Sequence, residues 1–118
     1  MQYMLLIYSS VEAGPAEGTP AQDAMNAEYF AFSQKAMEAG VMQAGAPLQG
    51  VDTATTVRVR SGKRVVTDGP FAETKEHLLG YYLLDCADID EANTWASQIP
   101  TATYGSIEVR PVLMIPGM

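Results

Sequence analysis

The side chains that could carry chemistry gather in one stretch, residues 67–82, which lies between two apolar runs. Asp68 is a candidate general base, a role that requires a buried carboxylate. His77 is the only histidine of the chain, and imidazole is the side chain best suited to proton transfer near neutral pH. Acid–base catalysis by Asp68 or His77 is therefore one hypothesis for this stretch.

The same stretch has simpler interpretations. Turn chemistry accounts for residues 68–71, since aspartate accepts hydrogen bonds from backbone amides, glycine and proline set the dihedral angles, and Phe71 packs down. The charged run at 73–77 is typical of a solvated connection. Glu73 and His77 would share a face if this segment were helical, but two ligands make a poor metal site. We therefore expect no metal.

Aromatic and charged residues could line a ligand cavity. Tyr81 and Tyr82 point to opposite faces of a predicted strand, so one of them should face the interior. Arg110 could hold an anion, whereas Glu108 on the same strand face favours a simple internal pair. The candidate ligand-binding residues are Tyr29, Phe71, Glu73, Lys75, Tyr81 and Arg110.

The composition predicts a single domain over residues 1–118 and argues against several classes of partner. With 47% hydrophobic and 18% charged residues, the chain can build a core. A net charge of -7 suits neither nucleic acid nor an anionic membrane. Cys86 is the only cysteine and is expected to pack as a small hydrophobe. The N-terminal run has no basic leader and is too short for a membrane span, so we expect a cytoplasmic protein. No glycine-rich phosphate loop or GxSxG motif is present, and we expect no cofactor.

The hydrophobic periodicity predicts strands alternating with two helices. We expect strands at residues 2–8, 41–46, 55–60, 64–67, 81–86 and 106–114, with a hairpin turn at 61–63. Thr19-Pro20 starts the first helix, where Gln22 can reach back to the cap, and Asp88 caps the second. The apolar stripes of these helices are Met25, Tyr29, Phe32 and Ala36, and Ala92, Trp95, Ala96 and Ile99.

This order of elements predicts a ferredoxin-like α+β fold, in which two helices cover one face of an antiparallel sheet. The other face of the sheet would be uncovered. Because an uncovered apolar face is usually buried against a second copy, we expect a homodimer whose sheets face each other.

The motifs resemble one known family. Asp68-Gly69-Pro70-Phe71, the following residues 72–76 and Gly80-Tyr81-Tyr82 are similar to the DGPF branch of the YCII-related family, as are Ile99-Pro100 and residues 107–111. The resemblance implies a ferredoxin-like domain that forms a dimeric α+β barrel. It also implies a bacterial protein, in a branch often found beside extracytoplasmic-function sigma factors, and it implies no particular reaction.

One departure from the family pattern limits what the resemblance implies. Short YCII-like relatives resemble enzymes because they carry a histidine on the first helix and an aspartate before the proline that follows the second. The corresponding positions here are Tyr29 and Ile99, which cannot act as a base and its orienting acid. The enzymatic suggestion made for those relatives therefore does not carry over.

Three functions remain as hypotheses. The first is a small-molecule-binding homodimer with a cleft near residues 68–71, lined by aromatic side chains. The second is a cofactor-free enzyme with Asp68 or His77 as its acid or base, an analogy at the level of the fold. The third is a regulatory protein-interaction role linked to a sigma factor.

Overall fold

The computed structural model describes residues 1–118. Its elements follow in the order β1 (Gln2–Ser9), α1 (Pro20–Glu38), β2 (Met42–Pro47), η1 (Val51–Thr53), β3 (Thr55–Arg60), β4 (Lys63–Asp68), β5 (His77–Asp85), α2 (Ile89–Ala96), η2 (Pro100–Thr103) and β6 (Ser106–Pro111). Neither α-helix has the combination of length and apolar sequence that a membrane crossing requires.

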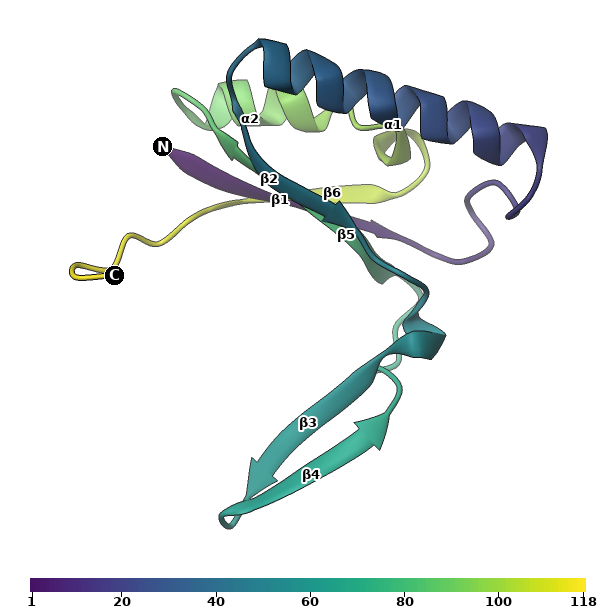
Figure 1. Ribbon diagram of the computed structural model, residues 1–118, viewed down its shortest axis with the longest axis vertical. Helices are drawn as coiled ribbons and strands as arrows, with labels where there is room; N and C mark the ends of the chain where they lie inside the picture. Colours follow the sequence, from purple (N-terminus) through teal and green to yellow (C-terminus); the bar gives the residue numbers. More distant parts are fainter.

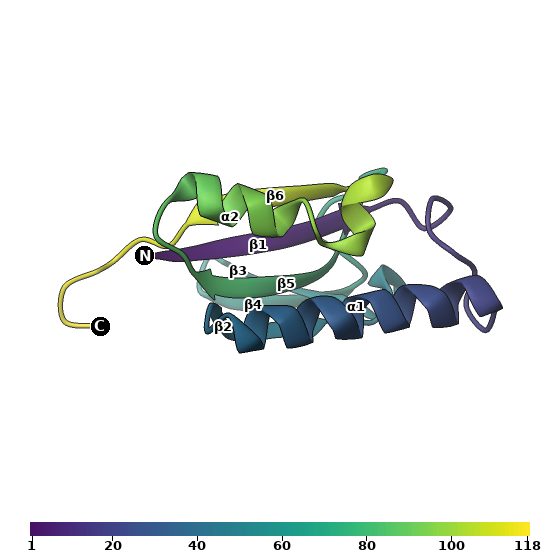
Figure 2. The same ribbon diagram turned by 90° about the horizontal axis from the view of Figure 1, so that it is seen from above.

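Four strands form one antiparallel sheet in the order β2-β5-β1-β6. Both helices lie on the same face of this sheet, α1 towards the β2 side and α2 over β1 and β6 (Figures 1 and 2). The predicted ferredoxin-like α+β fold is confirmed. The sheet of the single chain is open and does not close into a barrel.

The helix-facing side of the sheet carries the core, because strand side chains alternate between the two faces. Leu5 and Leu84 of this face are fully buried, as is Ile99 beyond α2. The predicted caps hold both helices: the Thr19 hydroxyl accepts a hydrogen bond from the Gln22 amide at 3.3 Å, and Asp88 accepts one from the Glu91 amide at 2.9 Å. Local sequence signals therefore fix where the two helices begin, and the packing of their apolar faces places them over the sheet.

The opposite face of the sheet is also largely apolar. The register pairs Met4 with Leu83 and Leu6 with Tyr81, and these residues alternate with the buried ones. All four are only half-buried, and no helix covers them. We refer to this surface as the open sheet face.

The β3–β4 hairpin is a separate two-stranded sheet. It projects from the body on the side away from the helices (Figure 1). Its turn, Ser61-Gly62, has two positive φ angles of 51° and 75°, as a type I′ hairpin turn requires. The hairpin was expected at these residues, but its separation from the main sheet was not.

Three sequence expectations were wrong in detail. The strand expected at 81–86 begins at His77, because residues 77–80 continue its pairing with β1 and β2. The last strand ends at Pro111 rather than Met114, on the edge of the sheet, where a residue without an amide hydrogen is tolerated. The Gln22 side chain donates to Asn26 at 2.8 Å and does not reach back to the helix cap.

Candidate functional site

The loop that follows Asp68 is held against the start of the hairpin. The Gly69 amide donates to the Ala54 carbonyl at 2.7 Å, and the Thr56 hydroxyl donates to the Gly69 carbonyl at 2.8 Å. Gly69 has a φ of 99°, a conformation that favours glycine. Asp68 is exposed, and its carboxylate accepts no hydrogen bond, so the amide-capping role expected of it is wrong. Backbone contacts and a threonine hydroxyl perform that role instead.

A cleft of about 530 Å³ lies where this loop meets the main sheet. Its apolar walls include Leu48, Val51, Pro70 and Phe71. His77, which is half-buried at the start of β5, also lines it. The remaining lining residues are Tyr8, Gln49, Gly50, Thr53, Ala54, Thr55, Thr56, Ala72, Thr74, Glu76 and Leu78. Apolar walls with a few polar groups at this volume are typical of small-molecule sites.

A second hollow, of about 570 Å³, adjoins this cleft, and five of its seven lining residues are polar or charged. The two share Tyr8, Thr74 and Glu76. Lys75 lines the second hollow only, opposite β6 residues that include Glu108. Lys75 and His77 therefore lie in neighbouring hollows and not in the same one.

Tyr29 and Tyr81 both line a third pocket, of about 430 Å³, between α1 and the edge of the sheet. Tyr82, Phe30, Asn26, Ser33, Ile7, Leu79 and residues 45–47 complete its lining. The neighbouring residues Pro47 and Leu48 line this pocket and the 530 Å³ cleft, respectively. The aromatic residues expected around one cleft are thus divided between two.

Hydrogen bonds within the protein occupy the hydroxyls of Tyr29 and Tyr82, the two tyrosines that lie between α1 and the sheet. The Tyr29 hydroxyl pairs with that of Thr101, which is 2% exposed, and the Tyr82 hydroxyl pairs with that of Ser33 at 3.0 Å. Burial raises the pKa of both tyrosines, and the hydrogen bonds oppose part of that rise. These phenols are therefore neutral and structurally committed at physiological pH.

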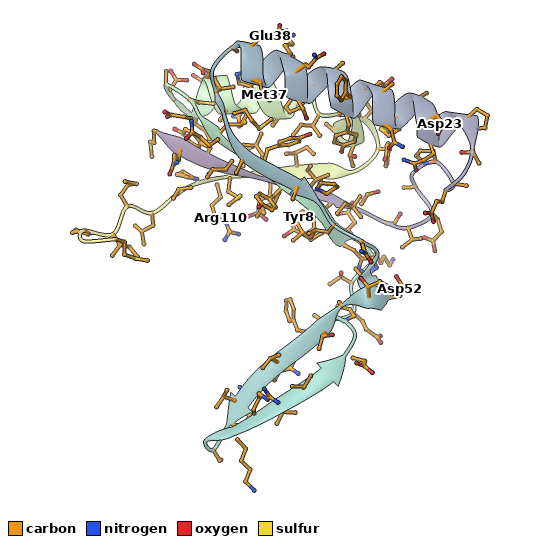
Figure 3. All side chains as sticks on the ribbon, in the orientation of Figure 1. Tyr8, Asp23, Met37, Glu38, Asp52 and Arg110 are labelled. Atoms are coloured by element: carbon orange, nitrogen blue, oxygen red, sulfur yellow. The ribbon has the colours of Figure 1, made fainter.

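Arg110 lines none of the three hollows. It projects on the side of the sheet opposite the helices, as does Tyr8 (Figure 3). Its guanidinium donates to the Glu108 carboxylate, which is the internal pair that the sequence offered as the alternative to an anion site. Glu73 also lines none of these pockets.

The shared face that a metal site would need is absent, because residues 73–76 are not helical and His77 is in a strand. No group of three or more histidine, cysteine, aspartate or glutamate side chains lies close enough to hold a metal ion. The arrangement around His77 thus offers proton transfer and hydrogen bonding as its chemistry.

Most residues of the cleft escaped the sequence reasoning, Tyr8 and Leu48 among them. Tyr8 lines two hollows, and its place in the alternation of β1 could have indicated that it faces away from the core. Leu48 lies in a loop, and no sequence signal connects it with Phe71. Only the chain's return from β2 to the hairpin brings those two residues together.

Two comparisons with known proteins bear on this site. The family model described as the YCII-related domain matches residues 1–116. An uncharacterized protein of Rhizobium meliloti (strain 1021) is 39% identical over 116 residues, which cover 97% of this chain and 94% of that protein. The similarity therefore includes the loop, the hairpin and all residues that line the three hollows.

Proposed function

This chain belongs to the family of YCII-related domains, and we propose that it is a small-molecule-binding homodimer whose ligand occupies the cleft beside residues 69–76. The observation that carries the proposal is the 530 Å³ cleft itself, which has Phe71 and Pro70 on one wall and His77 on the strand beneath. Clefts of this volume and composition hold ligands of metabolite size.

The lining of the cleft favours one class of ligand. Leu48, Val51 and Phe71 provide an apolar wall, whereas Gln49, His77 and several threonines provide hydrogen-bonding groups. No lysine or arginine lines the cleft, and Glu76 is its only carboxylate. A neutral organic molecule with an apolar body and a hydroxyl, amide or carbonyl group at one end fits this lining better than an anion does.

The homodimer part of the proposal rests on the open sheet face. Met4, Leu6, Tyr81 and Leu83 form a contiguous apolar surface on two paired strands, and they remain only half-buried in the single chain. An antiparallel sheet with apolar residues on both faces needs a second layer on each side. A second copy of the same face supplies that layer with two-fold symmetry.

A thermal-shift screen of neutral aromatic and aliphatic amides, alcohols and ketones tests the ligand proposal. A ligand at 100 times its Kd should stabilise the protein by about 2.7 kcal/mol. Phe71→Ala should abolish the shift of any hit, whereas Phe30→Ala should retain it. Both phenylalanines are exposed, at 78% and 67%, but Phe30 lines the separate 430 Å³ pocket. If a ligand still shifts the melting temperature of Phe71→Ala but not that of Phe30→Ala, the ligand binds in the 430 Å³ pocket instead.

A cofactor-free enzyme is the second candidate, and the position of His77 favours it. His77 lines the cleft, whereas Asp68 is exposed and lines none of the three hollows. Acid–base work at this site would therefore fall to His77. With a hit from the screen as substrate, His77→Gln should abolish turnover but retain binding, and Asp68→Asn should leave both unchanged. Turnover that persists in His77→Gln would eliminate this candidate.

The sigma-factor link stays a prediction. Co-purification of a sigma factor with the protein from native extract would support it. A homodimer that carries no partner through the same purification would count against it.

A further inference from the structure

The β3–β4 hairpin, which we call the arm (residues 55–68), is unusual in how little of it the rest of the chain covers. β3 and β4 pair only with each other, and every residue of β4 is exposed. The radius of gyration is 16.3 Å, whereas a compact chain of this length has about 13–14 Å. A hairpin of two strands is only marginally stable in water by itself. The arm therefore needs a surface to pack against.

One face of the arm carries three valines between Thr55 and Asp68 at its base and Arg64 near its turn. Val57 lies directly opposite Val66, and Val59 follows on the same face, next to Arg64. These three valines are 52–63% exposed. The other face carries Arg58, Arg60 and Lys63 around the single Val65. The arm is thus an amphipathic ribbon with its apolar side uncovered.

The charge of the arm is opposite to that of the body. The arm contains four of the chain's seven lysines and arginines and one of its fourteen acids, which gives it a charge of +3. The other residues contain three cations and thirteen acids, a charge of -10, and the two parts together make the net -7. The acidic bodies of two copies, meaning the residues outside the arm, repel each other. The positively charged arm of one copy attracts the acidic body of another. Arg64 lies on the same face as the three valines, so its charge would lie nearest to an acidic surface on which they pack.

We propose that the arm is an intersubunit clasp, which places its valine face on the acidic body of a second copy. This inference rests on the homodimer of the proposed function and adds to it which segment crosses between the subunits. The arm projects from the same side of the sheet as the open sheet face (Figure 1). Two copies that pair through that face therefore bring each arm alongside the other body. The two-fold symmetry of such a pair makes both clasps equivalent.

The clasp also connects the dimer with the cleft. Thr55 and Thr56, at the base of the arm, line the cleft, and Phe71 is the third residue after the end of β4. Arg58 donates to the Phe71 carbonyl at 3.3 Å, so one arm side chain holds the cleft loop. A second copy that binds the arm would therefore also restrict the motion of residues 69–76, which form one wall of the cleft.

Hydrogen–deuterium exchange of the full chain tests the clasp. Sedimentation velocity first measures the dimer Kd. Amides of residues 55–68 that pair within the hairpin should exchange at least tenfold more slowly well above this Kd than well below it. Equal exchange in a protein that does dimerise would overturn the clasp and leave the homodimer intact. A chain that is monomeric at every concentration would overturn both, while ligand binding would still be judged by the thermal-shift screen.

A matched pair of variants identifies the face that docks. Val57→Asp and Val65→Asp make the same substitution at neighbouring rungs of the arm, but on its opposite faces. Val57→Asp should raise the dimer Kd at least tenfold, because each dimer contains two altered clasps, and Val65→Asp should change it by less than threefold. Equal effects of the two variants would refute docking through the valine face. Protection of the arm that requires added heparin, with none from dimerisation, would show that the arm binds a polyanion and would also overturn the proposal.

Discussion

The hydrogen-bond partner of the Tyr29 hydroxyl distinguishes a ligand-binding role for this residue from a structural one. It pairs with the hydroxyl of Thr101, a residue that is 2% exposed, and this bond links α1 with the segment after α2. The Thr101 hydroxyl has no other partner among the side-chain hydrogen bonds of the protein. Tyr29→Phe keeps the ring and removes that partner, so we expect a loss of stability with little change in shape.

The expected loss is about 1–3 kcal/mol, the cost of leaving one buried hydroxyl without a hydrogen bond. Thr101→Val should cost less, because the hydroxyl of Tyr29 lines a pocket and can bind water. The double variant should be more stable than the sum of the two losses predicts, by about 1 kcal/mol, because it leaves neither group unpaired.

Urea unfolding of the four proteins measures these free energies by linear extrapolation. All must be compared at one protomer concentration, because dimerisation contributes to apparent stability. Tyr82→Phe is the matched control, since its partner Ser33 is half-buried and can be hydrated. It should cost less than Tyr29→Phe. If Tyr29→Phe costs less than about 0.5 kcal/mol, water replaces the hydroxyl and the assignment of a buried structural bond is refuted.

Three further perturbations follow from the same structure. Burial raises the pKa of the Cys86 thiol from 9.0 to about 11, so the thiol loses its proton at lower pH in the unfolded chain than in the folded one. The stability that the neutral buried thiol contributes is therefore complete below pH 9 and is lost as the pH rises through 11. Urea unfolding between pH 8 and 11 should show a loss of about 2–3 kcal/mol from this thiol, and Cys86→Ala should remove that part of the slope. Gly105→Ala would place a Cβ 2.3 Å from the backbone oxygen of Tyr8, which cannot move aside, and should cost about 3 kcal/mol or more. A melting temperature of Gly105→Ala within about 2 °C of that of the parent protein would contradict this expected loss of stability. Leu5→Ala empties a fully buried site and should cost about 2–5 kcal/mol in the same urea assay, and a smaller loss would mean that the core collapses into the space.

Much of the fold could be predicted because its signals are local. An apolar run rich in strand formers indicated β1, alternation indicated the two faces of β5, and the caps at Thr19 and Asp88 marked the helix starts. Each of these features depends on residues within about a turn of one another. The end of the last strand was placed three residues too late, because the apolar run continues past Pro111 with no strand to pair it.

The candidate site was harder to predict because its residues come from distant parts of the chain. Phe71 and Tyr29 were expected around one cleft, but α1 and the loop after β4 lie on opposite sides of the sheet. Leu48 joined Phe71 and His77 only through the return of the chain between β2 and the arm. No pattern in the sequence specifies such a meeting.

By itself, the amino-acid sequence determined the element types, the helix caps, the family and a hairpin at residues 55–67. These depend on side-chain periodicity and on hydrogen bonds between near neighbours. Only the tertiary structure decided that the hairpin leaves the sheet as an arm and that His77 begins a strand beneath a cleft. It also decided that Asp68 remains in solvent. Those outcomes depend on which strands pair with each other over long sequence distances. The pairing is set by the burial of whole sheet and helix faces and not by any single segment.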